Sequence, residues 1–143
     1  MPNNVTIEDI RVFLRDKLER NNLLERFEFT DKEIEGSMSM ALDWFNLAPP
    51  FTTSGVIPNR VLFIIGVSAF LLIGEAAAQM RNQLNYSDGG INVGVDDKAS
   101  LYMQLGQSLK LEFQQAAETY KAQVNAESAF GGQISPYSGL PIL

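Results

Sequence analysis

The sequence predicts an all-α protein: a helical bundle of about four helices, with a short β-like loop or hairpin and an extended C-terminal arm. Three observations over the 143 residues predict this class. Apolar residues recur at helical spacing, capping residues precede the periodic segments, and Pro or Gly clusters separate them. We therefore divide the chain into a helical bundle domain over 1–127 and an extended arm over 128–143.

The first helix is expected over 7–21. Thr6 precedes it as an N-cap, and Glu8 and Asp9 lie in the first turn, where the helix dipole favours anions. Arg11 falls on the polar face. Five residues at helical spacing form the expected apolar face: Ile7, Ile10, Phe13, Leu14 and Leu18.

The second helix begins after Thr30, which can form a capping box with Glu33. It should end before Pro49-Pro50, because proline disfavours helical geometry in the residue that precedes it. Its expected buried stripe is Ile34, Met38, Ala41, Leu42 and Phe45.

Ahead of this helix, a short helical turn packed on the core is expected from Leu23, Leu24, Phe27 and Phe29. In the loop that follows the helix, three apolar residues are expected to pack inward: Phe51, Val56 and Ile57.

The third helix is expected over 59–86, and its first half is apolar on every side. A membrane-spanning helix needs about 20 apolar residues. This run meets Glu75, Gln79 and Arg81 soon after Gly74, which favours a central core helix. The alternative, a small membrane protein with a span at 61–80, stays open.

A Gly-rich segment separates the third helix from the last. Ile91, Val93 and Val95 alternate with small or polar residues, which is typical of a short half-buried strand. Asp96 or Asp97 then caps a long helix expected over 98–125. The expected buried stripe of that helix is Tyr102, Leu105, Leu109, Phe113, Ala116, Ala117, Tyr120 and Val124.

The composition excludes several kinds of chemistry. The chain has no cysteine and no histidine, so thiolate chemistry and the usual general base are missing. A net charge of −6 argues against a nucleic-acid clamp.

Glu75 could be a buried acid with a raised pKa, and Asp88, Asp96 and Asp97 could hold a cation. Turn and cap roles explain those acids more simply, so we expect no enzyme, no metal and no cofactor.

Two extensions predict contacts with a partner. The 86–95 loop combines glycines with alternating apolar residues, which suits strand addition, and the 128–143 arm is apolar and carries no charged side chain. Aromatic residues on such an arm can anchor it to a partner. The candidate partner-binding residues are Ile91, Val93, Val95, Phe130, Gly131, Gly132, Pro136, Tyr137 and Leu140.

Four features give the chain a family resemblance. They are the capped acidic stretch FTDKEI at 29–34, the RNQLNY end of the third helix at 81–86, the SDGG to VDDK loop at 87–98, and the uncharged tail. Together they resemble the head-to-tail connector (adaptor, neck) proteins of tailed bacteriophages.

The resemblance implies a virion structural protein, made in the host cytoplasm and located in the neck. It implies a ring of copies of this chain, with twelve as the expected number, that joins the portal protein to tail and neck proteins. DNA would pass through without specific binding, and an acidic lumen suits that passage because it repels phosphates. No membrane contact is implied. The alternative is another small helical virion or tail assembly protein.

Overall fold

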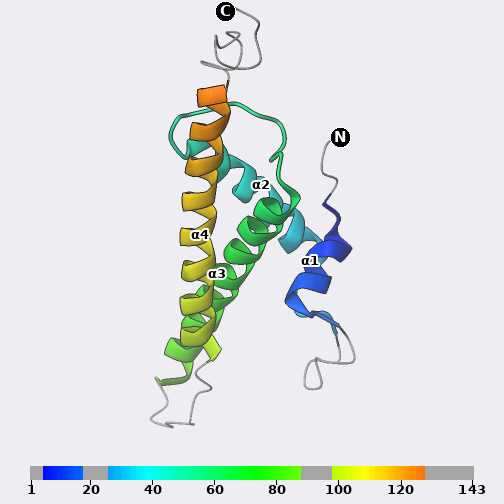
Figure 1. Ribbon diagram of the computed structural model, residues 1–143. Coiled ribbons are helices and arrows are strands. Elements are labelled where there is room, and N and C mark those ends of the chain that lie inside the picture. The colour runs from blue at the N-terminus through cyan, green and yellow to red at the C-terminus, as the bar shows by residue number, and fades with distance from the viewer. Residues whose placement is uncertain (1–4, 18–25, 88–97, 128–143) are drawn as a thin grey trace, which may run out of the picture.

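The computed structural model describes residues 5–17, 26–87 and 98–127 (Figure 1). Over these ranges the chain forms four helices and no strand: α1 (Ile7–Leu14), α2 (Asp31–Leu47), α3 (Arg60–Ser87) and α4 (Lys98–Ala126). The predicted all-α bundle is therefore confirmed. The predicted β-like segment around 91–95 and the predicted arm over 128–143 lie outside the described residues.

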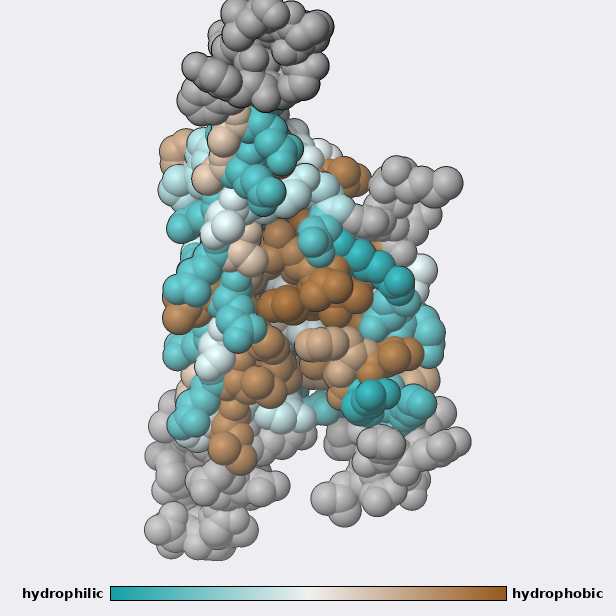
Figure 2. Space-filling view, viewed as in Figure 1, coloured by the Kyte–Doolittle hydropathy of each residue, from teal (hydrophilic) through white to brown (hydrophobic). Residues whose placement is uncertain are grey.

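Helix α3 is the centre of the arrangement. It contacts each of the other three helices, and its interface with α4 is the most extensive in the molecule. The two long helices run antiparallel, α2 crosses α3, and the short α1 lies on the opposite side of α3 from α4 in this view (Figure 1). Figure 2 shows the same face in space-filling form, with apolar surface in its middle.

Glycines set the close approach of α3 and α4. A β-carbon added at Gly106 would lie 2.7 Å from Ile73 Cγ1 and 3.1 Å from the Ile73 backbone nitrogen. A β-carbon at Gly66 would lie 2.7 Å from Cε2 of Phe113, whose ring is fully buried. Any larger residue at either position would push the helices apart, so this interface depends on two residues without side chains.

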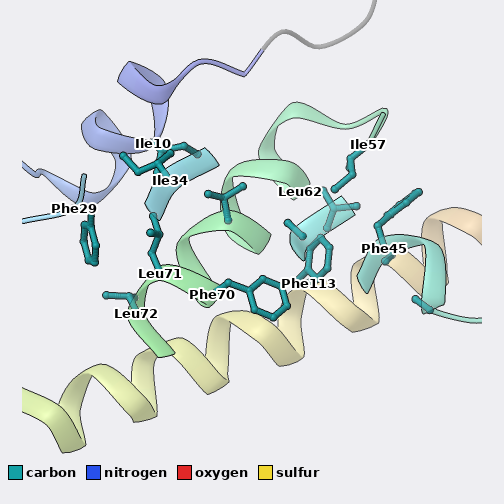
Figure 3. Packing of buried hydrophobic residues seen from close by; sticks show 14 residues of the cluster. Ile10, Phe29, Ile34, Phe45, Ile57, Leu62, Phe70, Leu71, Leu72 and Phe113 are labelled. Carbon is teal, nitrogen blue, oxygen red and sulfur yellow. The ribbon is translucent and has the colours of Figure 1, made fainter. Parts of the chain in front are cut away.

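The core is continuous through the bundle. Every residue over 66–72 in α3 is buried, which confirms a helix surrounded by protein at its middle. Figure 3 shows how the apolar side chains of the other elements meet around it. The largest members of this cluster are Ile10, Phe29, Ile34, Phe45, Ile57, Leu62, Phe70, Leu71, Leu72 and Phe113.

The first helix is shorter than predicted. It ends at Leu14 because Arg15 adopts a left-handed conformation with φ of 57°, and the next amide, Asp16 N–H, returns to the carbonyl of Arg11 at 2.9 Å. The Asp16 carboxylate then accepts hydrogen bonds from the amides of Glu28 and Phe29, at 2.7 and 3.2 Å. These bonds direct the chain out of the helix, whereas apolar periodicity alone favoured continuing it.

The predicted face of the first helix was partly wrong. Phe13 is 47% exposed, whereas Arg11, which was assigned to the polar face, is 7% exposed. The short turn predicted ahead of the second helix is not helical in its described part, 26–30. There Phe29 is buried as expected, but Phe27 is exposed and stacks under the Arg11 guanidinium at 4.3 Å. Arg11 is therefore buried where the apolar pattern placed phenylalanine side chains, and both Phe13 and Phe27 are exposed.

The second helix agrees with the sequence. The Thr30 hydroxyl accepts from the Glu33 amide at 3.2 Å, and the Glu33 carboxylate accepts from the Thr30 amide at 3.0 Å. The predicted stripe faces the core, with Ile34, Ala41 and Phe45 buried and its other two members partly buried. The end at Leu47, just ahead of the two prolines, is also confirmed.

The loop after α2 was predicted correctly at only one of three positions. Ile57 is fully buried, but Phe51 is 77% exposed and Val56 is also exposed. Asn46 holds this loop, because its side chain donates to the Ser54 carbonyl at 3.0 Å and accepts from the Ser54 amide at 3.1 Å. The loop is therefore fixed by polar bonds, which leave the two apolar side chains at its tip outside the core.

The bounds of the last helix are confirmed, but its buried face is shifted. Leu105 is 51% exposed, and Ala116 and Val124 are also exposed, so these three assignments were wrong. The line of contact with α3 runs through Gly106 instead of Leu105, because only a glycine fits there. The face that meets the core is Ala99, Tyr102, Gly106, Leu109, Phe113, Ala117, Tyr120 and Lys121.

Candidate functional site: polar ties and exposed apolar surface

The nine predicted partner-binding residues cannot be placed. Ile91, Val93 and Val95, and the six in the arm from Phe130 to Leu140, lie outside the described residues. The same holds for Asp88, Asp96 and Asp97, the acids considered for a cation. The site has to be built from the surfaces that the described residues form.

The one described candidate for acid chemistry is Glu75. Its side chain is half-buried and accepts a hydrogen bond from Nε2 of Gln79 at 2.9 Å, one helical turn away. Arg60, on the same helix as Glu75, pairs with Asp9 at 2.6 Å. Over 5–17, 26–87 and 98–127, no three acids come together in a group that could hold a metal ion.

A buried polar cluster joins α1 to the start of α2. The Arg11 guanidinium donates to the Phe29 carbonyl at 2.7 Å and to Oδ1 of Asp31 at 3.0 Å, and its Nε lies 3.9 Å from the buried Asp16 carboxylate. A buried charge of this kind is tolerated only when its partners are in place. Sequence periodicity missed this cluster because its hydrogen bonds join residues that are 13 to 20 positions apart in the chain.

A second polar tie joins α4 to the segment before α2. The Tyr102 hydroxyl donates to the Glu28 carboxylate, with O–O distances of 2.9 and 3.1 Å. Burial, followed by the hydrogen bond to Glu28, raises the pKa of Tyr102 well above its usual value. The phenol therefore stays protonated and acts as a donor, which is a structural role.

A third tie closes the opposite end of the bundle. Lys121 is 4% exposed, and its ammonium donates to the carbonyls of Phe45, Ala48 and Pro50, the latter two at 2.7 and 3.2 Å. These carbonyls end α2, so the lysine caps that helix. Burial lowers the pKa of the Lys121 ammonium. The contact also places the 48–51 loop beside the last turns of α4.

Exposed apolar side chains form pairs on several helices. Leu101 and Leu105 are one turn apart on α4, and Met40 and Leu47 are two turns apart on α2, so each pair shares a helix face. Figure 2 shows apolar surface gathered over the middle of the front face, between the hydrophilic borders formed by α4 and α1. The other large exposed apolar residues are Val12, Phe13, Phe27, Phe51, Val56, Val61, Met80, Leu111 and Val124.

A groove of about 400 Å³ lies between α2 and α3. One wall consists of Phe29, Glu33, Gly36, Ser37 and Met40, and the other consists of Phe70, Leu71, Gly74, Glu75, Ala78 and Arg81. Its volume falls within the range of about 300–1,000 Å³ that is usual for binding clefts. Sequence reasoning missed this groove, since its walls come from separate helices and no local pattern marks the residues that line it.

The apolar segment Arg60–Arg81 meets the length and composition of a membrane span, with a mean hydropathy of 2.3. Half of the window is buried inside this chain. Its middle turns are enclosed on all sides by other helices, and the buried Ser68 lies among them. These features are those of a core helix, which passes the same test of length and composition.

Comparisons with known proteins identify no relative. No family model, no curated protein and no solved structure matches this chain. A functional conclusion has to be argued from the chain itself.

Proposed function

We propose that this chain is a structural subunit that assembles with copies of itself into a ring, as the sequence resemblance to phage head-to-tail connectors implies. In this role it joins a portal to tail or neck components and lets DNA pass without specific binding. The alternative within the same class is another small helical virion assembly protein. Both are non-enzymatic, and both depend on surfaces that another subunit covers.

The observation that carries the proposal is the distribution of exposed apolar residues. They occur on α1, on α2, on the loop after it and on α4, and pairs such as Leu101 with Leu105 lie together on one face. Single exposed apolar residues are ordinary, but grouped ones mark interaction surfaces. A ring subunit presents two different faces to its two neighbours, so apolar groups on several sides suit that symmetry.

The charge of the chain is compatible with a DNA passage. A net charge of −6 gives no basic stripe for the phosphate backbone. An acidic surface facing the lumen would repel DNA and prevent it from sticking.

Imaging of the purified full-length protein by negative-stain electron microscopy, without detergent, tests the proposal. We expect closed rings with a central opening. A uniformly monomeric protein would overturn the assembly role. Solubility only in detergent would favour a second candidate, a membrane protein inserted through Arg60–Arg81, which the hydropathy of that segment supports.

Removal of residues 129–143 tests whether the arm takes part in assembly. The four helices do not need the arm for their described core, so the truncated protein should keep its helical circular dichroism. We expect it to lose its oligomeric state. Rings that persist after truncation would exclude the arm as an assembly element.

A further inference from the structure

We propose that the groove between α2 and α3 receives the uncharged C-terminal segment, residues 128–143, of a neighbouring copy of this chain. The inference rests on the proposed self-assembly and names one of its contacts. It assigns a docking site to described residues that were not among the candidates predicted from the sequence.

Two glycines show that the groove has room which this chain does not use. Gly36 in α2 and Gly74 in α3 both line it, and a β-carbon at either position would meet no atom within 4 Å. Glycine inside a helix costs stability relative to alanine. At Gly66 and Gly106 close helix packing explains the glycine, but among residues 5–17, 26–87 and 98–127 no contact explains Gly36 or Gly74.

The chemistry of the groove suits an apolar, uncharged occupant. Met40 is exposed at its edge, and Phe70 and Leu71 also line it. Figure 3 shows Leu71 beside Phe29, a third apolar member of the lining. Methionine adapts its shape to varied apolar partners. The groove therefore offers apolar contact together with backbone that a partner chain can approach closely.

The charged side chains that line the groove would attract a charged partner only weakly. Glu33 is engaged in the Thr30 capping box, and Glu75 accepts from Gln79. With Arg81 they sum to one negative charge. Residues 128–143 carry no charged side chain and include Phe130, so they meet no repulsion there.

The position of the groove favours the arm of a neighbour over the chain's own arm. Gly106 lies against Ala69 and Ile73, so the groove beside Gly74 is level with the first part of α4. From there to residue 127 the helix rises about 32 Å. At about 3.3 Å per extended residue, an arm returning within its own chain would spend about ten residues on that distance alone. It would also have to pass around α3, because the groove opens on a different face from the one that meets α4.

Cysteine cross-linking tests the contact directly, since the chain has no native cysteine. Ala78→Cys places a thiol in the groove, and Tyr137→Cys places one in the arm. The two single variants, carrying different tags, are co-expressed and treated with a short bismaleimide. We expect covalent dimers that contain both tags. Gln115→Cys, at an exposed position of α4, replaces the groove variant as the matched control and should give at least about fivefold less product.

The double variant Ala78→Cys/Tyr137→Cys distinguishes the two sources of the arm. Exchange between copies produces a ladder of covalent multimers on a denaturing gel. A cross-linked monomer as the main product would overturn the assignment to a neighbour. Equal yields from the groove and the Gln115 control would overturn the groove itself.

Filling the groove gives an independent readout. Gly74→Leu should not lower the melting temperature, because its side chain enters open space and leucine favours the helix more than glycine does, and it should lower the mixed-tag cross-link at least about fivefold. Gln115→Leu adds the same side chain elsewhere and should leave the yield unchanged. An unchanged yield in the Gly74→Leu variant would overturn the inference. If the wild-type protein is monomeric, the proposed function fails; if it is oligomeric but gives no groove cross-link, only this inference fails.

Discussion

The α3–α4 pair and the α1 side of the molecule are held together in different ways. At α3–α4, Gly66 and Gly106 remove side chains so that Phe113 and Ile73 can lie against a bare helix backbone. Helix α1 has eight residues and is joined to the start of α2 by Arg11, whose buried guanidinium donates to the Phe29 carbonyl and to the Asp31 carboxylate. The α3–α4 interface depends on two positions that lack side chains, whereas the contact of α1 with the start of α2 depends on polar side chains that must all be present.

This difference predicts different responses to mutation. A close-packed interface fails when volume is added, because protein interiors have few voids to absorb it. A buried polar cluster fails when one member is removed, because the others are left without partners in a place that water does not reach. The four predictions below probe this comparison.

The largest effect is expected at the polar cluster. Arg11→Met removes the guanidinium that donates to the Phe29 carbonyl and lies 3.9 Å from the buried Asp16 carboxylate, and it should lower the free energy of unfolding by about 3 kcal/mol. Chemical denaturation monitored by circular dichroism measures the change. Lys17→Met, an exposed neighbour, is the control and should have almost no effect. A loss below about 1 kcal/mol in Arg11→Met would show that α1 is held by apolar packing instead.

Adding one methyl group tests the helix pair. Gly106→Ala places a β-carbon in contact with Ile73 and within 3.2 Å of the Ala69 carbonyl oxygen. We expect a loss of about 2 kcal/mol from overpacking, measured as a lower denaturation midpoint. Gly74→Ala is the matched control, because its β-carbon enters open space, and it should gain about 0.5–1 kcal/mol from helix propensity. Similar effects at the two positions would contradict the account of close packing.

A smaller loss is expected at the tie between Tyr102 and Glu28. Tyr102→Phe keeps the ring and removes the hydroxyl that donates to the carboxylate at 2.9 Å. The site is partly buried, so we expect a loss of about 1 kcal/mol. The same substitution should increase the labelling of Glu28 by a carbodiimide. Wild-type stability in this variant would show that the ring alone positions α4 there.

The smallest effect concerns the cap of α1. The hydrogen bond from the Thr6 amide, opposed by some burial and aided by Arg60, holds the pKa of Asp9 below its usual value. The charged form therefore stabilises the folded state above the unfolded pKa, and that contribution is lost as the pH falls through the folded pKa. The stability difference between wild type and Asp9→Asn should shrink as the pH is lowered from 6 to 3. A constant difference would assign the effect to packing.

Local signals predicted much of the helical fold. The Thr6 N-cap, the Thr30 capping box, the two prolines and the period of α2 are encoded within a few residues, and their outcomes were correct. The end of α1 and the burial of Arg11 depend on contacts with Phe29 and Asp31 far along the chain, which no local pattern contains. The shift from Leu105 to Gly106 follows from how closely two helices approach. Hydrophobicity alone ranks glycine below leucine and so selects the wrong face.

The groove was also beyond local reasoning. Its walls come from two helices, and its open space is visible only when α2 and α3 are placed together. The sequence around Gly36 and Gly74 does not distinguish these two glycines from Gly66 and Gly106. The functional residues predicted in the loop and arm remain predictions, because they lie outside the described residues.

Native mass spectrometry of the full-length protein, in aqueous buffer without detergent, tests self-assembly most directly. The account predicts one dominant species whose mass is a whole-number multiple of the 15.9 kDa chain. The number of copies in that species gives the size of the ring. A spectrum that shows only the single chain at every protein concentration measured would contradict the account.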